Sequence, residues 1–346
     1  MTVRSTPFFC AVFFTLLIVM GCESPSSSPP HNLFAPDNLA MAPNPDDPTR
    51  QILYAGNPLT GPASVVGTAP SNSTITVIDL PAESPRAAPI VTGGILQDIT
   101  VSQDGRQLFV TKIDGSGGLL VSYSTGVWFT ETASAPITTG TPGETALSSI
   151  GNFIYIVTTN PNGLLKFSST TFTQEAQVSL SFTPTVLGVS PRGAVLIGNP
   201  VSGTIEFFTD TSSLPISITV GGIPEGLSFS PDGSAAFVTV SSPPQVVAID
   251  LSGTLSSFFT VSVSGIPKGI ATAMTTTSLV FIANANGTFS AVSFSTSSTV
   301  MSLSLGGIPR QVVLSQDGTR AYVSNSLNNS IAVIDTGRFQ NINTIQ

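Results

Sequence analysis

The sequence predicts an all-β fold, a seven-bladed β-propeller with four antiparallel strands in each blade. A hairpin motif with Asp-Gly in its turn returns along the chain with a period of about 43 residues, and a Gly-Ile-Pro junction returns with the same period. Between these markers, runs such as "TVSVS" and "SLSL" alternate polar and apolar residues, as half-buried strands do. Four short strands in each period of about 40 residues are typical of propeller blades. The 346 residues hold seven such periods.

The hairpin motif predicts where the first two strands of a blade meet. It reads "VSQDG", "FSPDG" or "LSQDG", and an apolar run such as "AAFVTV" follows it. Glycine tolerates the positive φ of a tight turn, and the aspartate before it can bond to the local backbone. Aspartates at equivalent places in different blades are spread around a ring, so we predict turn residues and not one converging site. They are Asp104, Asp232 and Asp317 in these turns, with Asp79, Asp250 and Asp335 at the ends of third strands.

The junctions "GGIPEGL", "SGIPKGI" and "GGIPRQV" mark the step from one blade to the next. With weaker copies upstream, they place the blade starts near residues 36, 96, 142, 184, 224, 267 and 309. The first copy carries extra residues in "GNPLTGPASVVGTAPSNS". A membrane barrel is disfavoured because its strands need about ten residues, and an array of sandwiches would not restart with the same hairpin in each period.

The ends of the chain predict how the ring closes. The first blade begins on an inner strand at Leu39, and the last blade ends on an outer strand, "NINTIQ". We therefore expect blades 1 and 7 to meet by packing without a shared strand, with residues 32–35 as a possible strap.

The N-terminus has the pattern of an export signal. Arg4 supplies a positive start, "PFFCAVFFTLLIVMG" supplies a short apolar region, and Gly21 precedes Cys22. The order Val19-Met20-Gly21-Cys22 resembles the lipobox of bacterial lipoproteins, which implies cleavage of residues 1–21 and lipidation of Cys22. Residues 22–35, rich in Ser and Pro, are predicted to be a tether to the propeller at 36–346. We expect a monomer that contacts the membrane through Cys22, at the outer membrane or cell surface of the bacterial envelope.

Composition limits the chemistry. Charged residues make up 9%, the net charge is −8 and the pI is about 4.4, which disfavours nucleic acid as a partner. Cys10 would leave with the signal and Cys22 would be acylated, so the mature domain keeps no thiol for a disulfide or a nucleophile. The one histidine, His31, lies in the tether, which argues against histidine-based catalysis and zinc. Neither a haem motif nor a Gly-rich phosphate loop is present, and we predict no cofactor.

The second strand of each blade carries a further resemblance. The chain has "YVSN" at 322–325, "FIAN" at 281–284, "FVTK" at 109–112 and "FVTV" at 237–240. With the flanking "SPDG", "VIDT" and "GGIP", residues 36–346 resemble the YVTN β-propeller repeat. The resemblance implies a quinoprotein-like propeller of the kind found in secreted and surface-attached proteins, including surface-layer proteins. Lys112 and Val240 replace the Asn of the motif, whereas other copies keep it, so this Asn is not predicted to be catalytic. The copies that keep it have Asn57, Asn199, Asn284 and Asn325.

The candidate site is the rim of the central channel, where junctions and innermost strands meet. One or two polar residues from each blade should lie there: Asp37, Gln97, Asp98, Glu144, Thr185, Glu225, Lys268 and Arg310. Glu225 with Glu144 and Asp37 comes nearest to an oxygen ligand set for a metal. Lys268 and Arg310 would instead favour an anion, and a third interpretation is a mixed rim of local ion pairs. We assign no catalytic residue and no metal ligand.

These observations favour a lipid-anchored, non-catalytic binding or scaffolding module for a protein or glycan partner, because a propeller presents rigid faces decorated with loops. Two alternatives stay open. One is a propeller enzyme of lactonase or quinoprotein-like type with a metal at the rim, and the other is a structural component of a surface coat.

Overall fold

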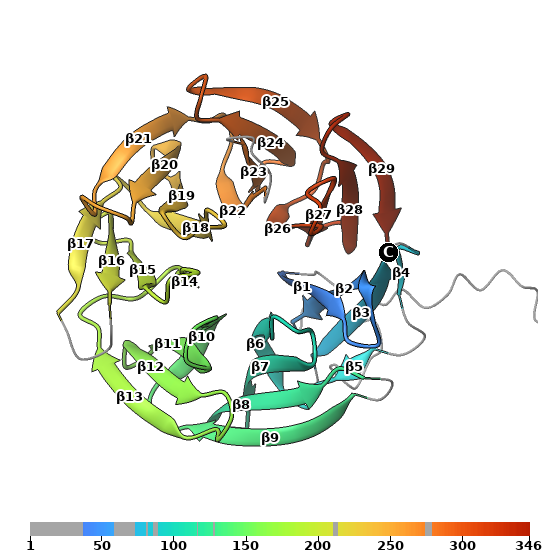
Figure 1. Ribbon diagram of the computed structural model, residues 1–346, viewed down its shortest axis with the longest axis vertical. Helices are drawn as coiled ribbons and strands as arrows, with labels where there is room; N and C mark the ends of the chain where they lie inside the picture. Colours follow the sequence, from blue (N-terminus) through green and yellow to red (C-terminus); the bar gives the residue numbers. More distant parts are fainter. Residues whose placement is uncertain are drawn as a thin grey trace, which may run out of the picture. The chain divides into compact units, whose positions relative to one another are not determined.

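The computed structural model describes residues 37–58, 73–80, 82–85, 89–115, 117–126, 129–209, 214–273 and 279–346. Their strands form seven antiparallel sheets around a central channel, each built from one continuous stretch of chain (Figure 1). The predicted seven-bladed propeller is thereby confirmed. The predicted signal peptide, Cys22, the tether with its possible strap, and most of the insertion in the first copy lie outside the described residues.

Blades 2 to 7 each have four strands in sequence order, with the first strand at the channel and the fourth on the circumference (Figure 1). Blade 2 has β6 (Ile95–Val101), β7 (Gln107–Asp114), β8 (Gly117–Ser124) and β9 (Thr130–Ile137). Blade 3 has β10 (Thr141–Leu147), β11 (Phe153–Thr159), β12 (Gly163–Ser168) and β13 (Gln174–Ser179). Blade 4 has β14 (Leu187–Val189), β15 (Val195–Asn199), β16 (Thr204–Phe208) and β17 (Ile216–Thr219).

The last three blades repeat this order. Blade 5 has β18 (Pro224–Phe229), β19 (Ala235–Ser241), β20 (Pro244–Asp250) and β21 (Ser257–Ser262). Blade 6 has β22 (Pro267–Thr272), β23 (Leu279–Asn284), β24 (Thr288–Ser293) and β25 (Ser298–Ser304). Blade 7 has β26 (Pro309–Leu314), β27 (Arg320–Asn325), β28 (Ser330–Asp335) and β29 (Gln340–Ile345).

Blade 1 departs from the four-strand plan at its outer edge. It has β1 (Asn38–Asn44), β2 (Asp47–Asn57) and β3 (Thr74–Leu80), and two short strands then pair with β3. These are β4 (Ser84–Pro85), at the end of β3, and β5 (Ile90–Val91), at its start. The fourth strand of this blade is therefore divided into two pieces.

Hydrophobic cores lie between the blades. Among the described side chains, seven buried clusters each join two neighbouring sheets. Phe109 and Leu120 of blade 2, for example, pack with Ile154 and Phe167 of blade 3. Successive side chains of a strand point to opposite faces, so each sheet packs against both of its neighbours. Because full burial of one such side chain contributes about 1.5–3 kcal/mol, this packing is the main force that holds the ring together.

The seam between blades 1 and 7 is closed by side chains, as the sequence predicted. In the described chain no strand is shared between these two sheets. Leu39 of blade 1 belongs to one buried cluster with Tyr322 and Ile345 of blade 7. On the face that carries the first turns of the blades, the backbone N–H of Gln316 donates to Gln51 Oε1 at 3.0 Å.

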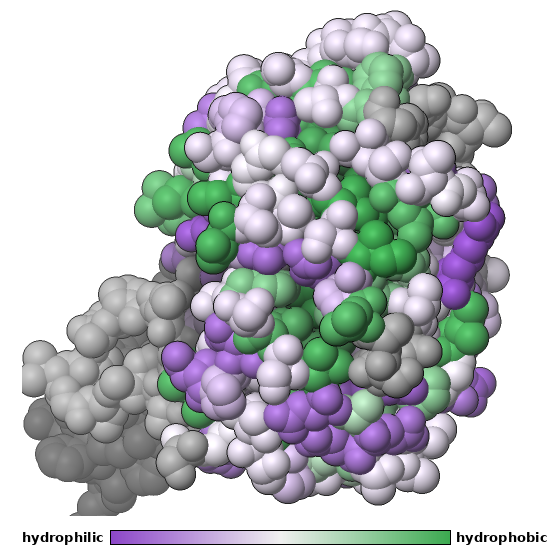
Figure 2. Space-filling model, turned by 90° about the vertical axis from the view of Figure 1, so that its left-hand side faces the viewer, coloured by the Kyte–Doolittle hydropathy of each residue, from purple (hydrophilic) through white to green (hydrophobic). Residues whose placement is uncertain are grey.

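The outer wall of the ring mixes polar and apolar residues. Figure 2 views the molecule from the side that carries β13 and β17 in Figure 1, where green and purple side chains are interspersed. Single exposed hydrophobic residues of this kind are normal on soluble domains. Among the described residues, no helix reaches the length and apolar character that crossing a membrane would take.

Candidate functional site at the mouth of the central channel

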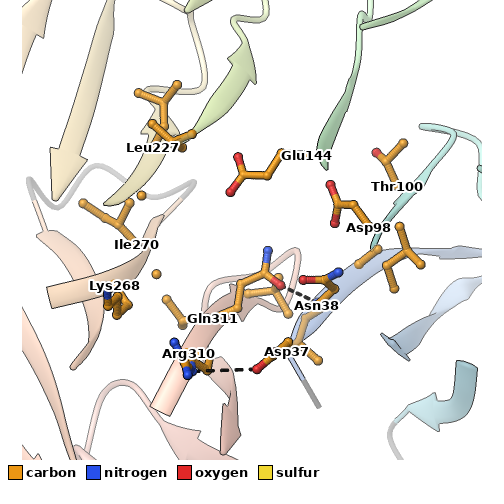
Figure 3. Close-up of a pocket in the computed structure, with 18 of the residues that line it drawn as sticks. Asp37, Asn38, Asp98, Thr100, Glu144, Leu227, Lys268, Ile270, Arg310 and Gln311 are labelled. Atoms are coloured by element: carbon orange, nitrogen blue, oxygen red, sulfur yellow. Dashed lines mark hydrogen bonds and ion pairs between the residues drawn. The ribbon is translucent and has the colours of Figure 1, made fainter. Parts of the chain in front are cut away.

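Seven of the eight predicted rim residues line one cavity at the end of the channel where the blade junctions lie. The cavity has a volume of about 610 Å³, and we call it the charged mouth. Figure 3 shows Asp98 and Glu144 on one side and Lys268 and Arg310 on the other. The seven are Asp37, Asp98, Glu144, Thr185, Glu225, Lys268 and Arg310.

Gln97 is the exception, because it does not line the charged mouth. It stands between Leu96 and Asp98, where the pairing of β6 with β7 shifts by one residue. Its Nε2 folds back to donate to the carbonyl of Leu96 at 3.2 Å, and the next residue, Asp98, takes the place at the channel.

A bulge in the inner strand explains why the junction residues reach the channel. The register shifts just after the start of the first strand in five blades, and in four of these a proline begins the shift. A bulge leaves one residue unpaired and turns its side chain away from the regular alternation. Glu225, Lys268 and Arg310 each follow a junction proline at such a shift. In blades 5, 6 and 7 the repeat thus brings the residue after the junction proline to the mouth.

Both basic side chains of the charged mouth have acidic partners across a blade boundary. Lys268 Nζ of blade 6 lies 2.7 Å from Glu225 Oε2 of blade 5. Arg310 Nε of blade 7 lies 3.8 Å from Asp37 Oδ1 of blade 1 (Figure 3). Lys268 and Arg310 are therefore engaged with carboxylates, which argues against the anion site that the sequence offered as one interpretation. Partly exposed pairs of this kind contribute little stability, about 0–1 kcal/mol each.

Asp98 and Glu144 also reach across blade boundaries, but to backbone amides. Asp98 Oδ2 accepts a hydrogen bond of 2.7 Å from the Thr145 N–H of blade 3. Glu144 Oε2 accepts one of 2.7 Å from the Leu187 N–H of blade 4. Gln311 does the same for blade 1, because its Oε1 accepts from the Leu39 N–H. The sequence analysis missed Gln311, although its position two residues after the junction proline is a usable signal.

The electrostatics of the two carboxyl groups follow from this enclosure. Burial raises the pKa of Asp98 to about 7, against the effect of its backbone hydrogen bonds. Burial raises the pKa of Glu144 to about 8, and the charge of the neighbouring Asp98 adds to the shift. Glu144 is therefore mostly protonated at pH 7. Burial also raises the pKa of Asp37, and Arg310 opposes that change.

The three carboxylates that come nearest to an oxygen ligand set for a metal do not assemble into one in this arrangement. Of the three, Glu225 is paired with Lys268, Asp37 with Arg310, and Glu144 is bonded to the Leu187 amide. In the part of the chain that the structure describes, no three His, Cys, Asp or Glu side chains gather as a metal site would require. What the mouth contains is a set of polar contacts that cross several blade boundaries.

The repeated aspartates are turn residues, as predicted. Asp104, Asp232 and Asp317 each accept a serine hydroxyl at 2.6 Å from two residues before. Each also accepts the backbone N–H of the residue two positions later at 3.1 Å. These bonds lower the pKa of all three carboxyl groups.

The Asn of the "YVSN" motif holds the junction of its own blade. Asn325 Oδ1 accepts from the Ile308 N–H at 2.9 Å, and its Nδ2 donates to the Gly306 carbonyl at 2.9 Å. Lys112 occupies the same position in blade 2, and its buried Nζ donates to the Thr92 carbonyl at 2.5 Å. Asn325 and Lys112 thus bond to the junctions of their own blades, whereas Asn57, Asn199 and Asn284 donate to side chains of the third strand.

In blade 5, where Val240 stands at this position, a different strand supplies the donor. Gln245 Nε2 of β20 donates to the Val220 carbonyl of the junction at 2.9 Å.

Fold and channel together define a β-propeller with a polar, internally paired mouth. The sequence matches the family described as choice-of-anchor I domain over residues 144–345, which is more than half of the chain. The chain therefore belongs to the choice-of-anchor I domain family. A search of curated proteins found no match.

Several solved structures share the fold. A functionally unknown protein from Desulfotomaculum acetoxidans DSM 771 aligns with a TM-score of 0.70 and 17% identity, covering 79% of this chain and 92% of that one. Hydrazine synthase of Kuenenia stuttgartiensis aligns with a TM-score of 0.68 and 15% identity, over 88% and 96%. The dihydro-heme d1 dehydrogenase NirN aligns with a TM-score of 0.61 and 14% identity, over 79% and 61%. Identities this low show the fold alone.

Proposed function

We propose that this chain is a non-catalytic binding or scaffolding module of the bacterial cell envelope, for a protein or glycan partner. The observation that carries the proposal is the bonding of the rim from blade to blade. Glu225, Lys268 and Glu144, the groups that an enzyme would keep free, are engaged in contacts between blades. A rigid ring of this kind presents its loops at fixed positions, which lowers the entropy cost of binding a partner.

The attachment to the envelope is part of the same proposal. The order Val19-Met20-Gly21-Cys22 supports lipidation at Cys22, and the Ser/Pro-rich stretch at 22–35 would hold the propeller away from the outer membrane or cell surface. The description of the matched family also refers to an anchor. We further assign the repeats to the YVTN type, on the strength of "YVSN", "SPDG" and "GGIP".

The test measures binding and turnover on one preparation. Full-length protein, extracted from the bacterial envelope in mild detergent, is titrated with a panel of soluble cell-wall glycans and with envelope proteins captured by cross-linking in cells. We expect at least one partner to bind with a saturable isotherm and to be recovered chemically unchanged. Release of a modified product with repeated turnover would establish an enzyme, and absence of saturable binding across both panels would also overturn the proposal.

A further inference from the structure

The channel has a second mouth whose chemistry differs from the first. On the face of the first turns, a cavity of about 860 Å³ is lined by residues of all seven blades, and none of the described lining residues is charged. We call it the neutral mouth. Its walls include Pro43, Pro191, Pro231 and Phe229. Apolar residues shared with the charged mouth, such as Ile270, form the throat between the two cavities.

Hydrogen bonds between neighbouring blades brace this mouth. Ser149 Oγ of blade 3 donates to the Pro191 carbonyl of blade 4 at 3.2 Å. The hydroxyls of Ser228 in blade 5 and Thr272 in blade 6 lie 2.9 Å apart. A cavity whose walls are fixed before a ligand arrives binds it at a lower entropy cost.

Two amide side chains at the mouth retain their full capacity for hydrogen bonding. Gln103 and Gln316 are exposed, line the cavity, and make no side-chain hydrogen bond within the described part of the chain. Each amide offers two donors and one acceptor oxygen. The aspartates beside them, Asp104 and Asp317, are engaged by their own turns and do not line this cavity.

The lining selects a class of ligand. A charged ligand would lose hydration here without gaining a countercharge, which is costly. A wholly apolar ligand would cover the amides of Gln103 and Gln316 without bonding them, which also costs free energy. A neutral saccharide has apolar faces for Phe229 and the prolines, and hydroxyls for the amides. The volume is within the range of about 300–1,000 Å³ that is usual for small-molecule sites.

We propose that the neutral mouth binds an uncharged saccharide, bonded by Gln103 and Gln316 and packed against Phe229. This inference rests on the proposed binding function and specifies a ligand class for it.

The experiment uses saturation-transfer NMR on full-length protein in mild detergent, with neutral di- and trisaccharides and with uronic acids and amino sugars as charged probes. Neutral probes should bind, and charged ones should bind at least about tenfold more weakly. Gln103→Glu and Gln316→Glu each replace donors by a charge at almost the same size, and each should weaken neutral binding about tenfold or more. Gln340→Glu, on the exposed outer strand β29, adds the same charge and should leave binding unchanged.

Three results would overturn the inference: no neutral saccharide binds, charged probes bind as well as neutral ones, or both mouth variants bind like the wild type. Loss of binding in Glu225→Gln, with binding kept in Gln103→Glu and Gln316→Glu, would place the ligand in the charged mouth. That result would also overturn the inference. If an envelope partner still binds the same preparation while saccharides do not, only this inference fails, and the proposed function stands.

Discussion

Glu83, in the turn between β3 and β4 of blade 1, forms an ion pair with Arg320 of β27 and joins the first blade to the last. Its second carboxylate oxygen accepts a hydrogen bond of 2.8 Å from Asn343 Nδ2 on β29. In Figure 1 the end of β29 lies beside β4. Because the two sheets share no strand in the described chain, this contact and the buried cluster around Tyr322 close the ring.

Glu83→Gln should therefore loosen the closing seam. The side chain of Glu83 is 9% exposed, and its loss of charge leaves the Arg320 guanidinium without its partner. We expect the free energy of unfolding to fall by about 1–3 kcal/mol in urea denaturation. Glu175→Gln is the matched control. The side chain of Glu175 is 40% exposed and its Oε2 lies 3.8 Å from Lys166 Nζ, so this variant should lower the free energy of unfolding by less than about 0.5 kcal/mol. Equal effects of the two variants would contradict a special role for Glu83.

Stability should decrease as pH rises from about 4 to about 8. In the folded state the pKa values of Asp98 and Glu144 are raised to about 7 and about 8, while in the unfolded chain both return to ordinary values near 4. Below that range both states hold the protons, so this contribution to stability is fully present. It is lost as pH rises through the folded pKa values, because the unfolded state releases its protons first.

Melting temperatures measured from pH 5 to pH 9 check this prediction. The turn aspartates have lowered pKa values, so their titration changes stability only below this range. Asp98→Asn and Glu144→Gln should each flatten the decrease. A wild-type melting temperature that rises over this range, or a slope unchanged in both variants, would contradict the assignment.

Calcium should leave the melting temperature unchanged. A cation that binds only the folded state raises stability with its concentration, but Glu225 is paired with Lys268 and Glu144 is mostly protonated at pH 7. We expect no shift at millimolar CaCl₂ in differential scanning fluorimetry, with MgCl₂ at equal ionic strength as the control. A rise in melting temperature with CaCl₂ but not with MgCl₂ would support the alternative of a metal-dependent enzyme.

The fold could be predicted from the sequence because its signals repeat. The Asp-Gly hairpins and Gly-Ile-Pro junctions each recur at one spacing, and a residue such as Asp317 bonds to Ser315 and Thr319 of its own turn, so local sequence suffices. The positions of the rim residues followed from the same junctions. The division of the fourth strand in blade 1 could not be predicted from the sequence, because an interruption that occurs in one blade has no repeating signal.

The partners of the rim residues could not be predicted from the sequence, for a physical reason. A bulge decides whether Gln97 or Asp98 faces the channel, and residue order alone does not locate the shift in register. The acceptor role of Gln311 depends on an amide of Leu39, which lies at the other end of the chain. The neutral mouth was missed because its Gln, Ser and Pro residues are also ordinary turn residues.

Lys112→Met should destabilise blade 2. The buried Lys112 Nζ donates to the carbonyls of Thr92 and Gly93, and methionine keeps the length of the side chain but supplies no donor. Leaving the Thr92 carbonyl unsatisfied should cost about 1–3 kcal/mol in chemical denaturation. Arg106→Met, at a side chain that is 72% exposed, should change stability by less than about 0.5 kcal/mol. A Lys112 variant as stable as the wild type would show that the junction needs no donor from this strand.

Cys22→Ser should release the protein from the membrane if Cys22 carries the lipid. Detergent phase partitioning and incorporation of labelled palmitate both report acylation. Wild type should enter the detergent phase with label, and Cys22→Ser should lose both properties because no other cysteine follows the apolar region. Cys10→Ser is the matched control, since Cys10 lies within the segment that the proposal expects to be cleaved, and this variant should behave as wild type. Retention of label in Cys22→Ser, or its loss in Cys10→Ser, would contradict the proposed lipidation site.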